Sequence, residues 1–126
     1  MLRQTGAVSF FSAPPSAAVA DLPEDPSADV FVLDVREPYE WQAGHIPGAV
    51  HVPMNSIPTT VHYEPDRIPT DRRVHVVCAV GARSGQVTAW LVQNGFDAVN
   101  IAGGMHAWAD AGRPMVSENG APPQVL

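Results

Sequence analysis

The stretch that most constrains the fold of this chain runs from Val74 to Gly95, VHVVCAVGARSGQVTAWLVQNG. Its first four residues are rich in valine and predict a buried strand. Residues 84–94 predict a helix with Val87 and Trp90 on one face, and Gly95 stands where glycine commonly ends a helix. A strand, a short loop and a helix in this order are typical of a parallel sheet covered by helices.

The rest of the chain repeats this alternation. Residues 30–35 form a continuous apolar run of the kind found in strands buried on both faces. The expected strands are residues 6–11, 30–35, 49–52, 74–77 and 98–101; one or two helical turns are expected at 16–22, and helices at 38–41, 55–61, 84–94 and 104–111. The sequence therefore predicts an α/β fold with a small, open, mostly parallel central sheet of about five strands and helices on both faces.

The length of 126 residues is that of one domain with a core of its own. We expect this domain to span residues 1–116 and the Gly- and Pro-containing residues 117–126 to form a flexible tail. The single cysteine excludes an internal disulfide, which fits a reducing compartment or a reactive thiol.

The net charge of −6 makes non-specific binding to nucleic acid or to an anionic membrane unfavourable. No stretch approaches the roughly 20 apolar residues of a membrane span. The apolar run at residues 7–11 is shorter than the roughly 7–15 apolar residues of a secretion signal. We therefore expect a cytoplasmic protein without nucleic-acid or membrane partners.

Cys78 lies directly after the strand expected at residues 74–77. The loop that follows it combines small residues with one cation and one hydroxyl: Ala79, Val80, Gly81, Ala82, Arg83 and Ser84. Such a loop can turn its backbone N–H groups toward the residue that begins it, and the next helix points its positive end at the same place. The pattern indicates a site for a thiolate or a persulfide on the Cys78 sulfur.

The last two residues of this loop, Arg83 and Ser84, each have a possible role. A nearby guanidinium lowers the pKa of a thiol from its usual value of about 8.5, and Arg83 could also assist an incoming anion. Ser84 could cap the helix and donate a hydrogen bond to the loop. The alternative at this point is that Cys78 is a buried structural thiol, because cysteine is among the most buried residue types.

Asp34 and Arg36 follow another expected strand, so they share with Cys78 the edge of the sheet where ligands of parallel α/β proteins bind. Because alternate residues of a strand point to one face, the two side chains are expected to pair. We interpret them as a structural ion pair or a brace for the cysteine loop, with assistance to catalysis as the alternative.

Other polar or aromatic residues are interpreted as structural. His45 is expected to stabilise a turn, and no histidine has the spacing of a metal site. Gly103 and Gly104 are expected to form a turn before the last helix, because they lack the spacing of a phosphate-binding loop. His51, His62, His75 and His106 receive no function, and the core anchors are Trp41, Trp90 and Trp108, one of which could line the rim of the pocket.

Residues 28–115 resemble a rhodanese-type sulfurtransferase domain. The resemblance is carried by the order and spacing of four segments: DVRE at 34–37, WQAGHIPGAVHV at 41–52, CAVGARS at 78–84 and AGGMHAW at 102–108. The second and fourth segments resemble the two signatures of the family, and the third resembles its active-site loop.

The resemblance implies a double displacement through a Cys78 persulfide held in the loop 79–84. The sulfur would come from a small donor such as thiosulfate and pass to a thiophilic acceptor such as cyanide or a thiol, with no metal or other cofactor. A sulfur-relay protein is a further partner consistent with this chemistry, and the chain could be a monomer or a homodimer.

Two alternatives to this enzyme remain. The first is a slow sulfur carrier or protein-binding module with the same fold. The second is a phosphatase of the related dual-specificity type, in which five residues separate the cysteine from the arginine, whereas four separate Cys78 from Arg83. Many loops of the family carry a basic residue directly after the cysteine. This chain has Ala79 and Val80 there, so the sequence leaves the sulfur donor open.

Overall fold

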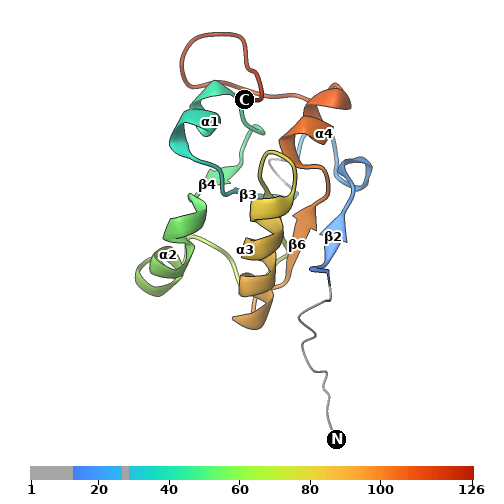
Figure 1. Ribbon diagram of the computed structural model, residues 1–126. Helices are drawn as coiled ribbons and strands as arrows, with labels where there is room; N and C mark the ends of the chain where they lie inside the picture. The colour runs from blue at the N-terminus through green and yellow to red at the C-terminus, as the bar shows by residue number, and fades with distance from the viewer. Residues whose placement is uncertain (1–12, 27–28) are drawn as a thin grey trace, which may run out of the picture.

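The computed structural model describes residues 13–26 and 29–126 (Figure 1). The strand expected at residues 6–11 lies outside the described residues. Within the described ranges, the alternation of strands and helices extends over most of the chain and leads to a layered α/β domain.

Five parallel strands form the sheet, in the order β2-β6-β5-β3-β4. Their bounds are β2 Ser16–Ala17, β3 Phe31–Asp34, β4 Val50–His51, β5 Val74–Val77 and β6 Ala98–Ile101. The central strands β3, β5 and β6 have the apolar composition that burial on both faces requires. This arrangement confirms the predicted parallel sheet.

Helices cover both faces of the sheet (Figure 1). Their bounds are α1 Pro38–Ala43, α2 Ile57–Tyr63, α3 Ala82–Gln93 and α4 Gly104–Asp110, with 3-10 turns η1 Val19–Asp21 and η2 Met54–Ser56. Apolar residues of α2 and α3 pack against one face of the sheet, and those of η1 and α4 pack against the other.

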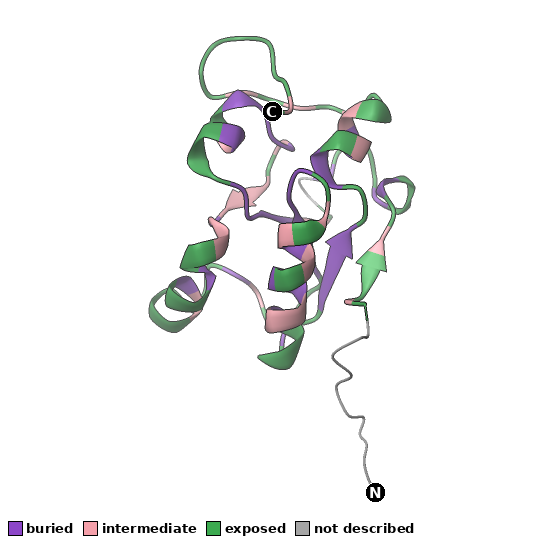
Figure 2. Cartoon of the chain, in the orientation of Figure 1, coloured by how far each residue is buried: buried purple, intermediate pink, exposed green. Residues whose placement is uncertain are grey.

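Strand β5, which is buried except at the half-buried His75, separates these two apolar clusters. Its neighbour β6 is buried along its length (Figure 2). Val74, Val76 and Cys78 belong to the cluster under α3, whereas Val77 belongs to the cluster under α4. The period of two along a strand therefore places the cysteine side chain on the α3 side.

Two expected elements begin differently in the structure. Helix α3 starts at Ala82 and not near Ser84, because Gly81 takes the N-cap position with a φ of 108°. The helical turns expected at residues 16–22 are confirmed only for η1. Ser16–Ala17 form an edge strand instead, because they pair with Asn100 and Ile101 of β6.

The segment 117–126, expected to be a flexible tail, lies along α1. The backbone N–H groups of Glu118 and Gln124 donate to the carbonyls of Gln42 and Ala43. These carbonyls belong to the last turn of α1. The carbonyl groups of a last helical turn receive no hydrogen bonds from within the helix. Gly44 contacts the backbone of Gln124 so closely that a side chain at this position would collide with it.

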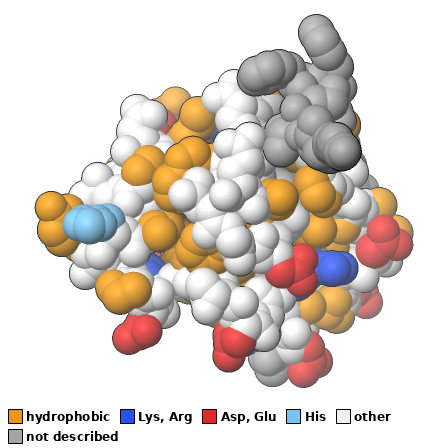
Figure 3. All heavy atoms as spheres, turned by 90° about the horizontal axis from the view of Figure 1, so that it is seen from below, with side chains coloured by type: hydrophobic (Ala, Val, Ile, Leu, Met, Phe, Trp, Pro, Cys, Tyr) orange, Lys and Arg blue, Asp and Glu red, His pale blue; other side chains and the backbone are white. Residues whose placement is uncertain are grey.

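Figure 3 shows the protein from the edge of the sheet opposite to α1 and α4. More acidic than basic side chains are visible on this face, in agreement with the net charge of −6. In the part of the chain that the structure describes, no helix is both long and apolar enough to cross a membrane.

Candidate functional site

Cys78 lies where the chain leaves β5, beside the end of β3. In the strand order, the chain moves outward from β3 to β4 in one direction and from β5 to β6 in the opposite direction. The strand order therefore reverses between β3 and β5. Ligands of open α/β sheets bind at the carboxyl ends of the strands at this point. The loop after Cys78 lies between α1 and α4, at the upper end of α3 in Figure 1.

The Cys78 sulfur receives two hydrogen bonds from its own loop. The Gly81 N–H group lies 3.1 Å from Sγ, and the Ser84 hydroxyl lies 3.2 Å from it. The left-handed conformation of Gly81 turns the loop back over the sulfur, which leaves the Cys78 side chain 0% exposed. Ser84 lies in the first turn of α3 and does not cap it, contrary to the expectation from the sequence.

These contacts determine the ionisation of the thiol. Burial by itself raises the pKa of Cys78, but the Ser84 hydroxyl and the backbone N–H groups of Ser84, Gly81 and Val80 outweigh it and lower the pKa below its usual value. Donors that converge on the sulfur favour the thiolate, which is the reactive form of cysteine.

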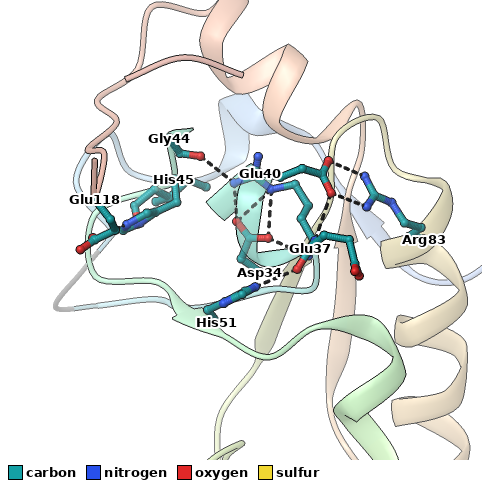
Figure 4. Close-up of polar contacts among 10 residues, drawn as sticks. Asp34, Glu37, Glu40, Gly44, His45, His51, Arg83 and Glu118 are labelled. Atoms are coloured by element: carbon teal, nitrogen blue, oxygen red, sulfur yellow. Dashed lines mark hydrogen bonds and ion pairs between the residues drawn. The ribbon is translucent and has the colours of Figure 1, made fainter. Parts of the chain in front are cut away.

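Arg83 does not project freely toward an incoming anion. Its guanidinium donates two hydrogen bonds to the Glu40 carboxylate, at 2.7 and 2.9 Å, across the gap between α3 and α1 (Figure 4). The hydrogen bond from Arg83 lowers the pKa of Glu40 despite its burial. The hydrogen bond to Glu40 in turn raises the pKa of Arg83, and the charge of the nearby Cys78 thiolate raises it further. The one cation of the loop 79–84 is therefore already neutralised.

The first turn of α1 positions Glu40 for this pair. Glu37 and Glu40 form a capping box, in which the Glu37 N–H donates to the Glu40 carboxylate at 3.0 Å, and Pro38 begins the helix. Sequence reasoning missed Glu40. The sequence feature that could have pointed to it is a single carboxylate within a short helix, which starts at the same edge of the sheet as the cysteine loop.

Asp34 and Arg36 form the expected ion pair, with 2.8 Å between Nη2 of Arg36 and Oδ2 of Asp34 (Figure 4). Both side chains are fully buried, and Arg36 also donates to the Gly44 carbonyl at 2.7 Å. The pair therefore joins the end of β3 to the end of α1, the helix that carries Glu40.

The start of α4 supports the cysteine from the other side. The N–H groups of Met105 and His106 donate to the carbonyls of Cys78 and Ala79, at 2.8 and 3.0 Å. Gly104 lies against the same two carbonyls with a φ of 59°, and a Cβ atom there would overlap them. Gly103 thus ends the expected turn before α4, whereas Gly104 begins the helix itself and allows this close approach.

Asn100 of β6 is a further member of the site that sequence reasoning missed. Its Oδ1 accepts the Ser84 hydroxyl at 2.5 Å, and its Nδ2 donates to the Gly81 carbonyl at 3.1 Å. Asn100 lies near the carboxyl end of its strand, at the edge of the sheet that also carries Asp34 and Cys78. The argument that pointed to those two residues could have found it.

Two of the histidines, His45 and His51, have structural contacts. His45 is buried, stacks on Trp41 and donates to Glu118 at 2.8 Å; Glu118 is a partner that the sequence did not reveal. His51 donates to the Arg36 carbonyl at 2.7 Å. Among the described residues, no three His, Cys, Asp or Glu side chains gather in a way that could hold a metal ion.

Comparisons with known proteins agree with this geometry. The family model of the rhodanese-like domain matches residues 16–111. A sulfurtransferase of Allochromatium vinosum is 43% identical over 93 residues, which cover 73% of this chain and 83% of that protein.

Two solved structures have the same fold. The protein SSP1007 of Staphylococcus saprophyticus is 38% identical with a TM-score of 0.68, over 79% of this chain and 98% of that one. A rhodanese-related protein of Thermoplasma volcanium is 33% identical with a TM-score of 0.69, over 81% and 97%. The sequence match and the arrangement of the strands lead to one conclusion: the chain belongs to the rhodanese-like domain family.

Proposed function

We propose that this protein is a sulfurtransferase that carries sulfane sulfur as a persulfide on Cys78. The observation that supports this most strongly is the pair of hydrogen bonds from Gly81 and Ser84 to the sulfur at the end of β5. The family membership and the sulfurtransferase relative support the same reaction class.

The reaction consists of two displacements at sulfur. The Cys78 thiolate attacks the outer sulfur of a donor such as thiosulfate, so that a new S–S bond forms and sulfite leaves with the electron pair of the old one. A nucleophilic acceptor, cyanide or a thiolate, then attacks the outer sulfur of the persulfide. The electron pair of the broken bond returns to Cys78, and no external oxidant or reductant is needed.

The loop favours both steps because its donors face the sulfur before any substrate binds. Preorganised N–H groups stabilise negative charge without the cost of reorienting solvent. The Cys78 sulfur carries this charge twice, as the attacking thiolate and as the leaving group. The lowered pKa of Cys78 has the same physical cause.

A carrier that receives sulfur from another protein is the second candidate, and two observations favour it. Cys78 is 0% exposed, so a donor has to displace loop atoms before it reaches the sulfur. In addition, Arg83 is held by Glu40, which leaves a dianion such as thiosulfate without a free cation from this loop.

The same ion pair argues against a phosphatase. In that reaction an arginine of the loop would have to hold the phosphate, but both terminal nitrogens of Arg83 donate to Glu40. The four residues between Cys78 and Arg83 also form a tighter loop than the five of the related phosphatases.

Steady-state kinetics test the proposal. We expect ping-pong behaviour, in which double-reciprocal plots at different cyanide concentrations are parallel, and we expect Cys78→Ser to abolish turnover. Fast turnover with cyanide or dithiothreitol favours the enzyme over the carrier. A carrier forms the persulfide but transfers its sulfur rapidly only to a protein acceptor. A Cys78→Ser variant with undiminished sulfur transfer would contradict both candidates.

A further inference from the structure

Asn100 contacts the cysteine loop at Ser84 and Gly81. It lies in β6 with only 9% of its surface exposed, and both ends of its amide are engaged, with the Ser84 hydroxyl and with the Gly81 carbonyl. Ser84 and Gly81 also donate hydrogen bonds to Cys78, at 3.2 and 3.1 Å. These two residues therefore link Asn100 to the sulfur.

The Ser84 hydroxyl has one hydrogen and two acceptors. Asn100 Oδ1 lies 2.5 Å from Ser84 Oγ, and Cys78 Sγ lies 3.2 Å from it. One hydroxyl can donate to only one of them at a time. The shorter bond holds the hydrogen while the sulfur is uncharged. A thiolate is the stronger acceptor, so ionisation of Cys78 draws the hydrogen to the sulfur.

We propose that Asn100 is a positioning residue for sulfur transfer, which holds the Ser84 hydrogen and releases it to the Cys78 sulfur only when that atom is charged. The proposal rests on the persulfide reaction proposed above. In the persulfide the charge lies on the outer sulfur, and the hydrogen returns to Asn100. When the acceptor removes the outer sulfur, the charge returns to Sγ and the hydrogen follows it by rotation about the Cβ–Oγ bond.

Because Asn100 competes for the Ser84 hydrogen, the Cys78 thiolate is less stabilised than it would be if the hydroxyl had no other acceptor. The nucleophilicity of a thiolate falls as its pKa falls, so the competition keeps Cys78 reactive. If Asn100 were purely structural, its loss would have the opposite effect on the pKa of Cys78. If it only braced the Gly81 carbonyl, its loss would loosen the loop, weaken the donors and raise the pKa of Cys78.

The test is the pH dependence of Cys78 alkylation by iodoacetamide in the full-length protein. We expect Asn100→Ala to lower the pKa of Cys78 by about one unit, because the freed hydroxyl then donates to the sulfur at all times. The alkylation rate of the fully ionised thiolate should fall about threefold for each unit of that shift. Ser84→Ala should raise the pKa, and adding Asn100→Ala to it should change nothing further.

Asn94→Ala is the matched control. Asn94 is exposed and its side-chain amide donates to the Trp90 carbonyl at the far end of α3, so its loss should leave the pKa of Cys78 unchanged. An Asn100→Ala protein with a raised or unchanged pKa would overturn the proposal. A fall of the same size in the Ser84→Ala background would also overturn it.

A measurement on the unmodified protein covers the case in which Asn100→Ala does not fold. When Cys78 ionises, Asn100 Oδ1 loses its hydrogen bond, so the NMR signals of the Asn100 side-chain amide should shift with the midpoint of thiolate absorbance. Signals that stay constant through this titration would contradict the proposal. Persulfide formation is measured separately by mass, so failure of the proposed function is distinguishable from failure of the Asn100 mechanism.

Discussion

Two arginine–carboxylate pairs lie near Cys78, and they differ in burial and in sequence separation. Arg36 and Asp34 are two residues apart, and both side chains are 0% exposed. Arg83 and Glu40 are 43 residues apart, and the Arg83 side chain is 35% exposed. The first pair joins β3 to the end of α1. The second joins α1 to the first turn of α3, directly beside the cysteine loop.

The difference between the pairs predicts different roles, support of the fold for the first pair and selection of the substrate for the second. A fully buried pair that also satisfies the Gly44 carbonyl holds the framework on which the loop rests. In the proposed sulfur transfer, a partly exposed pair next to the loop would determine how much positive charge an incoming donor meets. Loss of the first should therefore act mainly on stability, and loss of the second mainly on reactivity.

The largest effect is expected for Arg36→Met. It leaves the Asp34 carboxylate buried without a cation, which costs about 3–5 kcal/mol of the free energy of unfolding. Urea denaturation measures this cost. Arg73→Met is the control, because its pair with Asp97 is more than half exposed and is expected to contribute at most about 1 kcal/mol. Equal losses in the two variants would remove the distinction between buried and exposed pairs.

Glu40→Gln should have a smaller effect on stability, about 2 kcal/mol, because water screens the exposed part of Arg83. The pKa of Glu40 is lowered in the folded state, so its contribution is present above the unfolded pKa of about 4.3 and is lost as pH falls through the folded pKa. The difference between wild type and variant should thus shrink in acid.

The same variant should react faster with thiosulfate, because it frees Arg83 for the dianion. Stopped-flow rates of persulfide formation check this expectation. A lower rate with thiosulfate, in a protein that melts normally, would mean that the pair with Glu40 assists the reaction and does not limit it.

How much of this site the sequence predicts depends on how local each contact is. The alternation of valine-rich strands and helices predicted the parallel sheet, and the loop after Cys78 predicted donors at its sulfur. The common face of Asp34 and Arg36 predicted their pairing. These features depend on residues within one element or two adjacent ones.

The features that the sequence did not reveal depend on contacts between distant elements. Glu40 meets Arg83 only because α1 and α3 start at the same edge of the sheet, and Asn100 reaches Ser84 only because β6 lies beside β5. The contacts of the segment 117–126 with α1 likewise required the packed structure, since its Gly and Pro residues alone favour a tail.

The smallest effect is expected for Val80→Arg, which places an unpaired cation in the loop. Val80 is 62% exposed, so the new guanidinium remains in water and should contribute about 1 kcal/mol, or roughly fivefold in the rate with thiosulfate. This gain should decline as salt is added. Val92→Arg is the charge-matched control, because Val92 is exposed in the last turn of α3, about 14 Å along the helix from Arg83. A gain of the same size in both variants would indicate a general effect of net charge.

The mass of the intact protein after exposure to a sulfur donor tests the central claim most directly. Protein incubated with thiosulfate or, separately, with glutathione persulfide should gain the mass of one sulfur atom. Cyanide should remove this mass, and Cys78→Ser should never acquire it. A wild-type protein that stays unmodified with both donors, or a Cys78→Ser protein that gains the same sulfur, would contradict the assignment of sulfur transfer to Cys78.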